Sequence, residues 1–318
     1  MNRPDDKAAG TATKNPLRDQ EVVGATTTIP QDPEVTNARA AAIESGELLV
    51  SDRPNVLRSV LMQVVRGLRP LLALAIIWEV VARVTDASPI LLPRVFSILE
   101  AIWDGLASGF LLQHIGWTTF RLFAGFTLGA SLGILLGLMS GRIRWLADWT
   151  VPLVALFLPI PVLAFVPLFI LWFGLGNVPV ILLVAFGASM PVFMNSYTGT
   201  LSVDPVQIDA GQSMGARGRT LFWKIVFPGS LPYIVSGIRV GFARGWRAVI
   251  AGEMVSATGF GLGWMIFSAQ SLLQTANVMV GIIFIGVVGL VYEKLLWETL
   301  EQKTVVKWGM LSSGGSRR

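Results

Sequence analysis

Four ionisable residues interrupt an otherwise apolar stretch of the chain and define the chemistry that this sequence is equipped to perform. Arg239, Arg244, Arg247 and Glu253 all fall within or beside the run 232–255. A charge inside a membrane span is costly, so each one indicates either a function or a buried partner. Arg244 and Arg247 are three residues apart and therefore adjacent on a helix surface. Guanidinium groups bind oxyanions through paired hydrogen bonds, so this pair favours anion binding.

Two interpretations of these charges remain open from the sequence. In the first, Arg244, Arg247, Glu253 and the neighbouring Trp246 line a path along which an anionic solute crosses the membrane. In the second, the arginines pair with Glu79 or Glu253 and only hold helices together, since buried charges must be paired in either case. Trp246 either lines the path or packs against its surroundings. Arg239 and Glu253 are expected on a different side of the helix from the arginine pair.

The sequence disfavours catalysis within this chain. It has no cysteine and a single histidine, His114, to which we assign no role. No nucleophile–base pair and no set of metal ligands falls at membrane depth, so we expect no metal site and no intramembrane enzyme. The chain also lacks the G-x-x-x-x-G-K-[ST] phosphate loop. If ATP drives its activity, ATP and Mg²⁺ must be bound by a separate partner chain, with no cofactor here.

The elements that carry these residues are predicted to be membrane-spanning helices. Of the 318 residues, 53% are hydrophobic and only 14% are charged. The apolar runs are continuous and about 20 residues long, which indicates an all-α integral membrane protein rather than a β-barrel. Six spans are expected, at about Pro70–Val84, Phe120–Ser140, Trp145–Phe173 with a bend near Pro159 and Pro161, Val178–Tyr197, Pro232–Val255 and Val278–Leu296.

Four regions follow from this pattern. Residues 1–67 are a polar tail without a signal peptide and are expected to be disordered in the cytoplasm. Residues 68–114 hold the first span and an amphipathic helix at the outer surface, with Val95, Leu99, Ile102 and Leu106 at helical spacing. Residues 115–298 form a core of five helices with a polar loop at 201–230, and 299–318 form a C-terminal tail.

The distribution of basic residues predicts the orientation. Arginines and lysines lie in the 141–147 loop, in the 201–230 segment and in the C-terminal tail, whereas the 174–177 and 257–276 connections carry no charge. The positive-inside rule places both termini and the 201–230 segment in the cytoplasm. The formal net charge of +5 is therefore attributed to cytoplasmic loops rather than to nucleic-acid binding.

Small residues predict where helices approach closely. Glycines recur every fourth residue along the second span, at Gly125, Gly129, Gly133, Gly137 and Gly141, and again along the fifth, at Gly237, Gly241 and Gly245. Such stripes allow backbones to come close together. They indicate helix packing, with a gliding surface for conformational change as the alternative.

The 201–230 segment is too polar to span a membrane but is organised as helix, turn and helix. Asp204 is a suitable N-cap, with Pro205 at the first helical position. Val206, Ala210 and Met214 then share one face, and Gly215 fits a left-handed C-terminal position. A second helix is expected to begin near Thr220 and to end at Pro228. Helices this short are marginal alone, so the segment needs a membrane surface or another protein as partner.

The same segment resembles the "EAA" signature of bacterial ABC importer permeases. The family pattern is Glu-Ala-Ala, three residues, Gly, nine residues, then Ile-x-Leu-Pro. This chain has the same spacing at the residues Asp209, Ala210, Gly211, Gly215, Ile225, Phe227 and Pro228. It departs from the pattern at Asp209, Gly211 and Phe227. The resemblance extends over about residues 70–310 and is strongest to the nitrate, sulfonate, taurine and bicarbonate branch, in stretches such as "LPIPVLAFVPLFILWFGLGN" and "GWRAVIAGEMV".

This resemblance implies a type-I ABC importer (MetI-like) permease fold and a role as the transmembrane subunit of an importer in the bacterial plasma (inner) membrane. It further implies that the EAA segment is a coupling helix docked on an ABC ATPase, present in two copies, and that an extracytoplasmic solute-binding protein delivers a small anionic solute to a homodimer of this chain. A gradient-driven secondary transporter or channel is the alternative function, and an interfacial hairpin without a protein partner is the alternative for the segment.

Overall fold

The computed structural model describes residues 56–86 and 88–298. The predicted N-terminal tail, residues 1–67, falls largely outside these residues, and the predicted C-terminal tail, residues 299–318, falls wholly outside them. The chain divides into two units between Arg69 and Pro70, and the architecture described here is that of the second unit.

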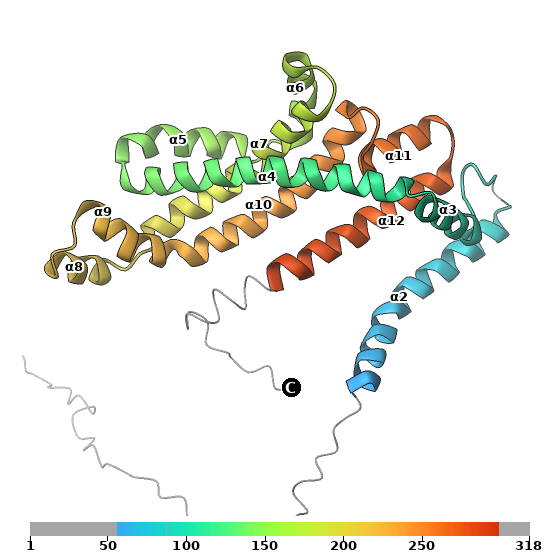
Figure 1. The fold of residues 1–318 in the computed structure, drawn as a ribbon, viewed down its shortest axis with the longest axis horizontal. Coiled ribbons are helices and arrows are strands. Elements are labelled where there is room, and N and C mark those ends of the chain that lie inside the picture. The colour runs from blue at the N-terminus through green and yellow to red at the C-terminus, as the bar shows by residue number, and fades with distance from the viewer. Residues whose placement is uncertain (1–55, 87, 299–318) are drawn as a thin grey trace, which may run out of the picture. The chain divides into compact units, whose positions relative to one another are not determined.

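The described residues form helices joined by short connections (Figure 1). Proline and glycine mark several of the breaks, as expected from the lost N–H donor of proline and the backbone freedom of glycine. The elements are α2 (Val56–Val84), α3 (Val95–Ala107), α4 (Phe110–Arg142), α5 (Arg144–Phe157), η2 (Val162–Phe165), α6 (Val166–Phe173), α7 (Asn177–Leu201), α8 (Pro205–Ser213), α9 (Gly218–Leu221), η3 (Phe222–Val226), α10 (Phe227–Ser256), α11 (Leu262–Ser271), α12 (Thr275–Tyr292) and η4 (Glu293–Glu298).

The predicted all-α membrane architecture is confirmed, whereas the expected number of spans is not. Four stretches of the described residues are long and apolar enough to cross a bilayer: α4, α7, the continuous 218–256 helix and α12 with its extension. The pair α5 and η2–α6 makes a fifth if its two arms, bent by 99°, count as one span. This bend falls at the predicted Pro159 and Pro161. The first expected span lies in α2, which is not among these stretches; Arg69, Glu79 and Arg83 interrupt it.

Helix α7 lies between the two glycine stripes and forms the centre of the core. A Cβ atom at Gly129 of α4 would come within 2.2 Å of the Ala185 carbonyl oxygen of α7, and one at Gly133 within 2.7 Å of the Ser189 carbonyl oxygen. On the other side, a Cβ at Gly241 of α10 would lie 2.6 Å from Val192. Both stripes thus permit backbone contact with the same helix, which supports the packing interpretation.

The opposite end of the core from α8 and α9 is built from α3, α11 and parts of α4 and α12 (Figure 1). Helix α3 was predicted to be amphipathic and to lie at the outer surface, with Val95, Leu99, Ile102 and Leu106 on its apolar face. The structure buries Ile98 beside Leu111 and Leu262 and packs Ile102 against the same cluster, while Leu99 is 57% exposed. The packed face therefore shares Ile102 with the predicted one but is turned toward Ile98, because the neighbouring helices α4, α11 and α12 offer apolar partners there.

The end of α2 is tied to the start of α3. Trp78 Nε1 donates a hydrogen bond to the Pro93 carbonyl oxygen at 2.9 Å. The Glu79 carboxylate accepts the Val95 N–H at 2.9 Å and the Arg83 Nε–H at 2.7 Å. Glu79 therefore satisfies a free backbone donor in the first turn of α3 and has an exposed arginine as its ion partner.

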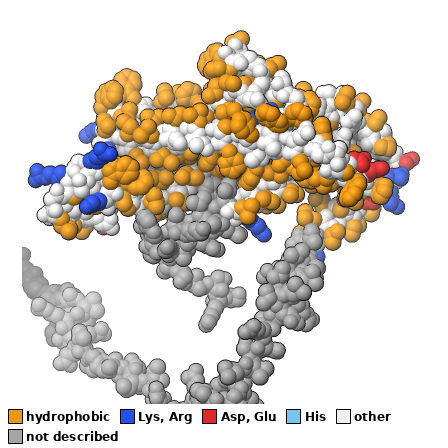
Figure 2. All heavy atoms as spheres, viewed as in Figure 1, with side chains coloured by type: hydrophobic (Ala, Val, Ile, Leu, Met, Phe, Trp, Pro, Cys, Tyr) orange, Lys and Arg blue, Asp and Glu red, His pale blue; other side chains and the backbone are white. Residues whose placement is uncertain are grey.

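The surface of the core is largely apolar along the helices and charged near its ends. Figure 2 shows basic side chains gathered at the end formed by α8 and α9, and acidic ones at the end near α3. Large apolar side chains such as Leu171, Trp145 and Leu132 are exposed at 80%, 70% and 46%. An apolar surface this extensive is typical of a protein in contact with lipid or with partner helices.

Candidate functional site

The polar 201–230 segment begins with the capped helix that the sequence predicts. The Asp204 side chain accepts a hydrogen bond from the Val206 N–H at 2.9 Å, and Pro205 occupies the first turn. Helix α8 ends at Ser213, and Gly215 follows with a φ of +84°. This left-handed backbone favours glycine, because an L side chain adopts it only with strain.

The second half of the segment differs from the prediction. A helix was expected from about Thr220 to Pro228, but α9 begins at Gly218 and continues through the π-helical turn η3 directly into α10. Pro228 does not end it, because it lies in the first turn of α10, just after the π turn has shifted the hydrogen-bond pattern. The segment that carries Ile225 and Phe227 is thus continuous with the helix that carries Arg244.

Packing within this segment explains one departure from the family signature. Gly211 is buried, and a Cβ placed on it would lie 2.0 Å from Cδ1 of Ile225. Ile225 therefore occupies the space that the second alanine of the signature would fill. Another side of this helix is open: Val206 is 71% exposed, Ala210 is exposed, and Met214, the C-cap residue that follows α8, is 88% exposed.

Arg244 and Arg247 line one cavity of about 510 Å³ between α10 and the break that separates α5 from α6. Its volume lies in the range of small-molecule sites. The remaining lining residues are apolar: Pro161, Val162, Leu163, Val240, Ala248 and Ala251.

The contacts of the two arginines leave much of their hydrogen-bonding capacity unused. Arg244 Nη2 donates to the Leu158 carbonyl oxygen at 2.6 Å, across the break, and Arg247 Nε donates to Ala243 in its own helix at 3.1 Å. No carboxylate of the described residues pairs with either guanidinium. The interpretation in which they pair with Glu79 or Glu253 therefore does not match the contacts observed.

Glu253 lies elsewhere, in a buried polar network. Its Oε1 pairs with Arg121 Nη1 at 2.7 Å, and its Oε2 accepts the Thr118 hydroxyl at 2.8 Å and the Gly263 N–H at 3.0 Å. The carboxylate is fully buried and is not among the residues that line the arginine cavity. Its contacts join α4, α10 and α11.

Sequence reasoning missed the partners of this network. Arg121 also donates to Asn177 Oδ1 at 2.8 Å and to the Phe260 carbonyl oxygen at 2.6 Å. His114 is fully buried, and its Nδ1 lies 2.8 Å from the Gly261 carbonyl oxygen and 2.9 Å from the Gly261 nitrogen. The sequence did contain a signal: Arg121 lies in the apolar run of the second span and is opposite in charge to Glu253.

Trp246 packs between helices. Its ring lies 5.7 Å from the ring of Tyr292, and a Cβ on Gly289 would come within 2.9 Å of its Nε1. It is not among the residues that line the arginine cavity. Its contacts favour packing against α12 over lining a path.

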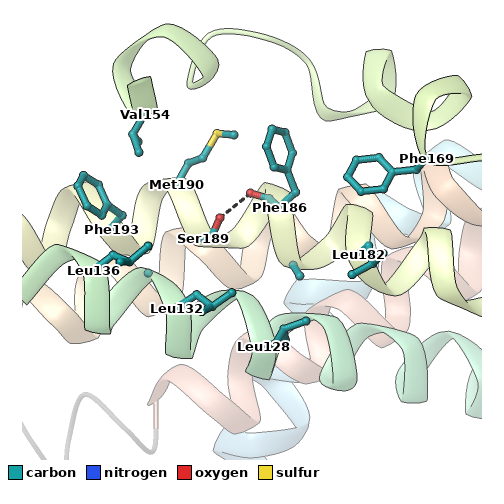
Figure 3. Close-up of a pocket in the computed structure, with 12 residues that line it drawn as sticks. Leu128, Leu132, Leu136, Val154, Phe169, Leu182, Phe186, Ser189, Met190 and Phe193 are labelled. Carbon is teal, nitrogen blue, oxygen red and sulfur yellow. Dashed lines mark hydrogen bonds between the residues drawn. The ribbon is translucent and has the colours of Figure 1, made fainter. Parts of the chain in front are cut away.

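A second cavity offers a contrast. It has a volume of about 330 Å³ and lies between α4 and α7, beneath α5 and α6 (Figure 3). Figure 3 shows Leu128, Leu132 and Leu136 along one wall and Phe186, Met190 and Phe193 along the other. The hydroxyl of Ser189 donates a hydrogen bond to the Phe186 carbonyl oxygen at 2.9 Å. This cavity presents no charge, so the arginine cavity is the better candidate for binding a polar solute.

Comparison with known proteins is consistent with a membrane transport subunit. Residues 129–295 match the family described as "Binding-protein-dependent transport system inner membrane component". The taurine transport system permease protein TauC of Escherichia coli is 35% identical over 73% of this chain and 86% of its own length. The putative aliphatic sulfonates transport permease protein SsuC of Bacillus subtilis is 32% identical over 73% of this chain and 83% of its own.

Among solved structures, a chain of the inward-facing MetNI methionine ABC transporter aligns with 64% of this chain and 96% of its own length. The TM-score is 0.42 and the identity is 20%.

Proposed function

This chain belongs to the family of binding-protein-dependent transport system inner membrane components, and from that membership we propose how it moves its solute. It is the transmembrane permease subunit of an ABC importer. We propose that it performs no catalysis itself, that its 204–228 segment couples it to an ATPase, and that an anion passes beside Arg244 and Arg247.

The open face of α8 is the observation that carries the coupling proposal. Val206, Ala210 and Met214 are apolar and exposed at the end of the molecule where basic side chains gather (Figure 2). A nine-residue helix does not hold an exposed apolar face for its own stability. A groove on a cytoplasmic ATPase subunit, as the EAA signature implies, would cover this face.

The continuity of η3 with α10 supports a direct mechanical connection. A movement of α8 and α9 imposed by the ATPase is transmitted along one uninterrupted helix, 218–256, to the arginine cavity. Alternating access then follows if ATP binding favours one orientation of this helix over the other. The glycine stripe of α10 against α7 is the packed surface across which that change must occur.

The unpaired arginines support an anionic solute. Two neighbouring cations inside an apolar span are stabilised when an anion neutralises them. The relatives named for taurine and aliphatic sulfonates carry solutes with a negative sulfonate group. We propose that the solute is small and carries a negative head group, as in nitrate, an alkyl sulfonate or the zwitterion taurine.

The partners follow from the family. We propose two copies of the chain related by a two-fold axis, two ATPase subunits that bind ATP and Mg²⁺, and a solute-binding protein at the extracytoplasmic face. The basic residues Arg142, Arg144, Arg217, Arg219 and Lys224 support a cytoplasmic location for the α8–α9 end. Both termini are proposed to lie on that side of the bacterial plasma membrane.

Co-purification tests this proposal. The tagged chain is expressed with the ATPase and binding-protein genes beside it, and proteins recovered in mild detergent are identified and quantified. We expect a stoichiometric ATPase that is lost in Ala210→Arg, on the exposed apolar face, and retained in Gln212→Arg, because Gln212 lies about 200° around α8 from Ala210 at about 100° per residue. A chain that purifies alone and carries solute in liposomes under an ion gradient would overturn the proposal.

A further inference from the structure

The arginine cavity combines two features that together restrict what it can bind. One side carries the guanidinium groups of Arg244 and Arg247, and the other consists of Pro161, Val162 and Leu163 from the break between α5 and α6. From these features we infer a specificity beyond anion selection. The inference rests on the proposed function, because it assumes that this cavity lies on the solute's path.

We propose that the cavity binds an organic oxyanion with one negative head group and an apolar body, and that it discriminates against zwitterions and against inorganic dianions. The head would bind the arginines, and the body would lie against the apolar wall. An alkyl sulfonate without an amino group is the simplest solute of this chemistry.

The charge of the site argues against a zwitterion. Neither arginine has a carboxylate partner among the described residues, so the protein itself contributes two like charges to the cavity, and these repel each other at adjacent helix positions. A monoanion reduces this net charge, whereas a zwitterion leaves it unchanged. The guanidinium groups also repel the ammonium of a zwitterion.

The nearest acidic side chain of the same helix is not available to an ammonium group. Glu253 is fully buried and is bonded to Arg121, Thr118 and the Gly263 N–H. Every lining residue other than the two arginines has an apolar side chain. An ammonium group in this cavity would therefore lose its water without gaining a charged acceptor.

The apolar wall argues equally against a dianion such as sulfate. Two arginines can satisfy the oxygens on one side of a tetrahedral anion, but Val162, Leu163 and Ala248 donate no side-chain hydrogen bonds to the other side. Oxygens turned toward that wall would be desolvated and unpaired, which is costly. In an alkyl sulfonate the same position is filled by methylene groups, whose burial is favourable.

The two arginines have different roles within this site. Arg247 is exposed, and its Nη atoms have no acceptor among the described residues, so it is the group that first meets the anion. Arg244 already donates to the Leu158 carbonyl oxygen at the end of α5. It retains further N–H donors, so it can bind the anion while it stays hydrogen-bonded to the break between α5 and α6.

A matched pair of probes tests the proposal directly. Propane-1-sulfonate and taurine have nearly the same size, and they differ in a terminal methyl group against an ammonium group. The chain co-expressed with its ATPase is placed in lipid nanodiscs without binding protein, and binding of radiolabelled propane-1-sulfonate is measured with taurine and with sulfate as competitors. Because the binding protein is left out, any preference among the three solutes comes from the membrane-embedded chain.

We expect propane-1-sulfonate to bind, and taurine and sulfate each to compete at least about tenfold less well, the loss that one unmade charged interaction produces. Arg247→Ala should weaken binding by about tenfold, Arg247→Lys by less, and Arg239→Ala not at all, because Arg239 pairs with Glu293 away from this cavity. Equal competition by taurine or sulfate, or unchanged binding in Arg247→Ala, would overturn the inference.

The same preparation separates this inference from the proposed function. Recovery of the ATPase reports on the importer assembly, whereas competition reports on the cavity. If the ATPase is recovered and taurine competes equally, the proposed specificity of the cavity is wrong and the proposed importer function stands. Selective binding without a recovered ATPase supports the cavity and counts against the coupling proposal.

Discussion

Arg121 and Glu253 meet 2.7 Å apart with side chains that are 1% and 0% exposed, although 132 residues separate them along the chain. The pair joins α4 to α10 beneath the connection that leads into α11. The additional partners of each member are neutral groups. Loss of one member is therefore poorly tolerated, because the remaining charge would be buried without a counter-charge.

Glu253→Ala is therefore expected to destabilise the folded chain by about 3–5 kcal/mol. Thermal unfolding of the purified protein in detergent measures the change. The matched control is Arg83→Ala, which removes an ion pair whose arginine side chain is 70% exposed and is expected to cost no more than about 1 kcal/mol. Comparable losses in the two variants would show that burial of the Arg121–Glu253 pair has little energetic consequence.

Gly129→Ala tests the close contact between α4 and α7. The new Cβ would lie 2.2 Å from the Ala185 carbonyl oxygen, which belongs to a helix backbone and cannot turn aside. The helices must separate, and we expect a loss of about 1–3 kcal/mol in the free energy of unfolding. Gly116→Ala in the same helix is the control, because its Cβ meets nothing within 4 Å. Alanine there should be neutral or stabilising by up to about 1 kcal/mol; the same loss at both sites would contradict the packing interpretation.

Two glycines of the coupling segment should respond differently to alanine. At Gly211 the obstacle is Cδ1 of Ile225, the end of a side chain that can tilt away from its rotamer at a cost of about 0.5–1.5 kcal/mol, offset by the better helix propensity of alanine. At Gly215 the obstacle is the backbone itself, with φ of +84°, which costs an L residue about 1–2 kcal/mol.

ATPase recovery in the co-purification assay measures the difference. Gly211→Ala is expected to retain the ATPase, and Gly215→Ala to lose part of it. A reversed order would mean that the identity of residue 211 matters to the ATPase directly, rather than through its packing against Ile225.

Transport kinetics separate the arginines of α10. In the assembled importer, Arg244→Ala and Arg247→Ala are each expected to lower solute uptake by about tenfold, since each removes a charged hydrogen-bond donor from the cavity. Arg239→Ala is expected to lower it much less, because this residue is 46% exposed and paired with Glu293. Small and equal losses in all three variants would favour a purely structural role for the cavity arginines.

Several features of this molecule follow from local patterns and were predictable for that reason. Apolar runs of span length, the Asp204 cap, the left-handed Gly215 and the bend at Pro159 and Pro161 each depend on residues close together in the chain. The spacing of the EAA-like residues is local in the same sense. Pro228 is the exception, because a π turn upstream shifted the hydrogen bonds that a proline usually breaks.

The sequence by itself thus determined the class of the protein, its family and the residues that carry charge into the membrane. Only the tertiary structure decided their partners. It assigned Glu253 to Arg121 rather than to the arginines of its own helix, and it set Arg244 against the break at Leu158. It also placed α7 between two glycine stripes. The physical reason is that hydropathy and helix periodicity are properties of neighbouring residues, whereas charge pairing and close packing depend on contacts between helices that are distant in sequence.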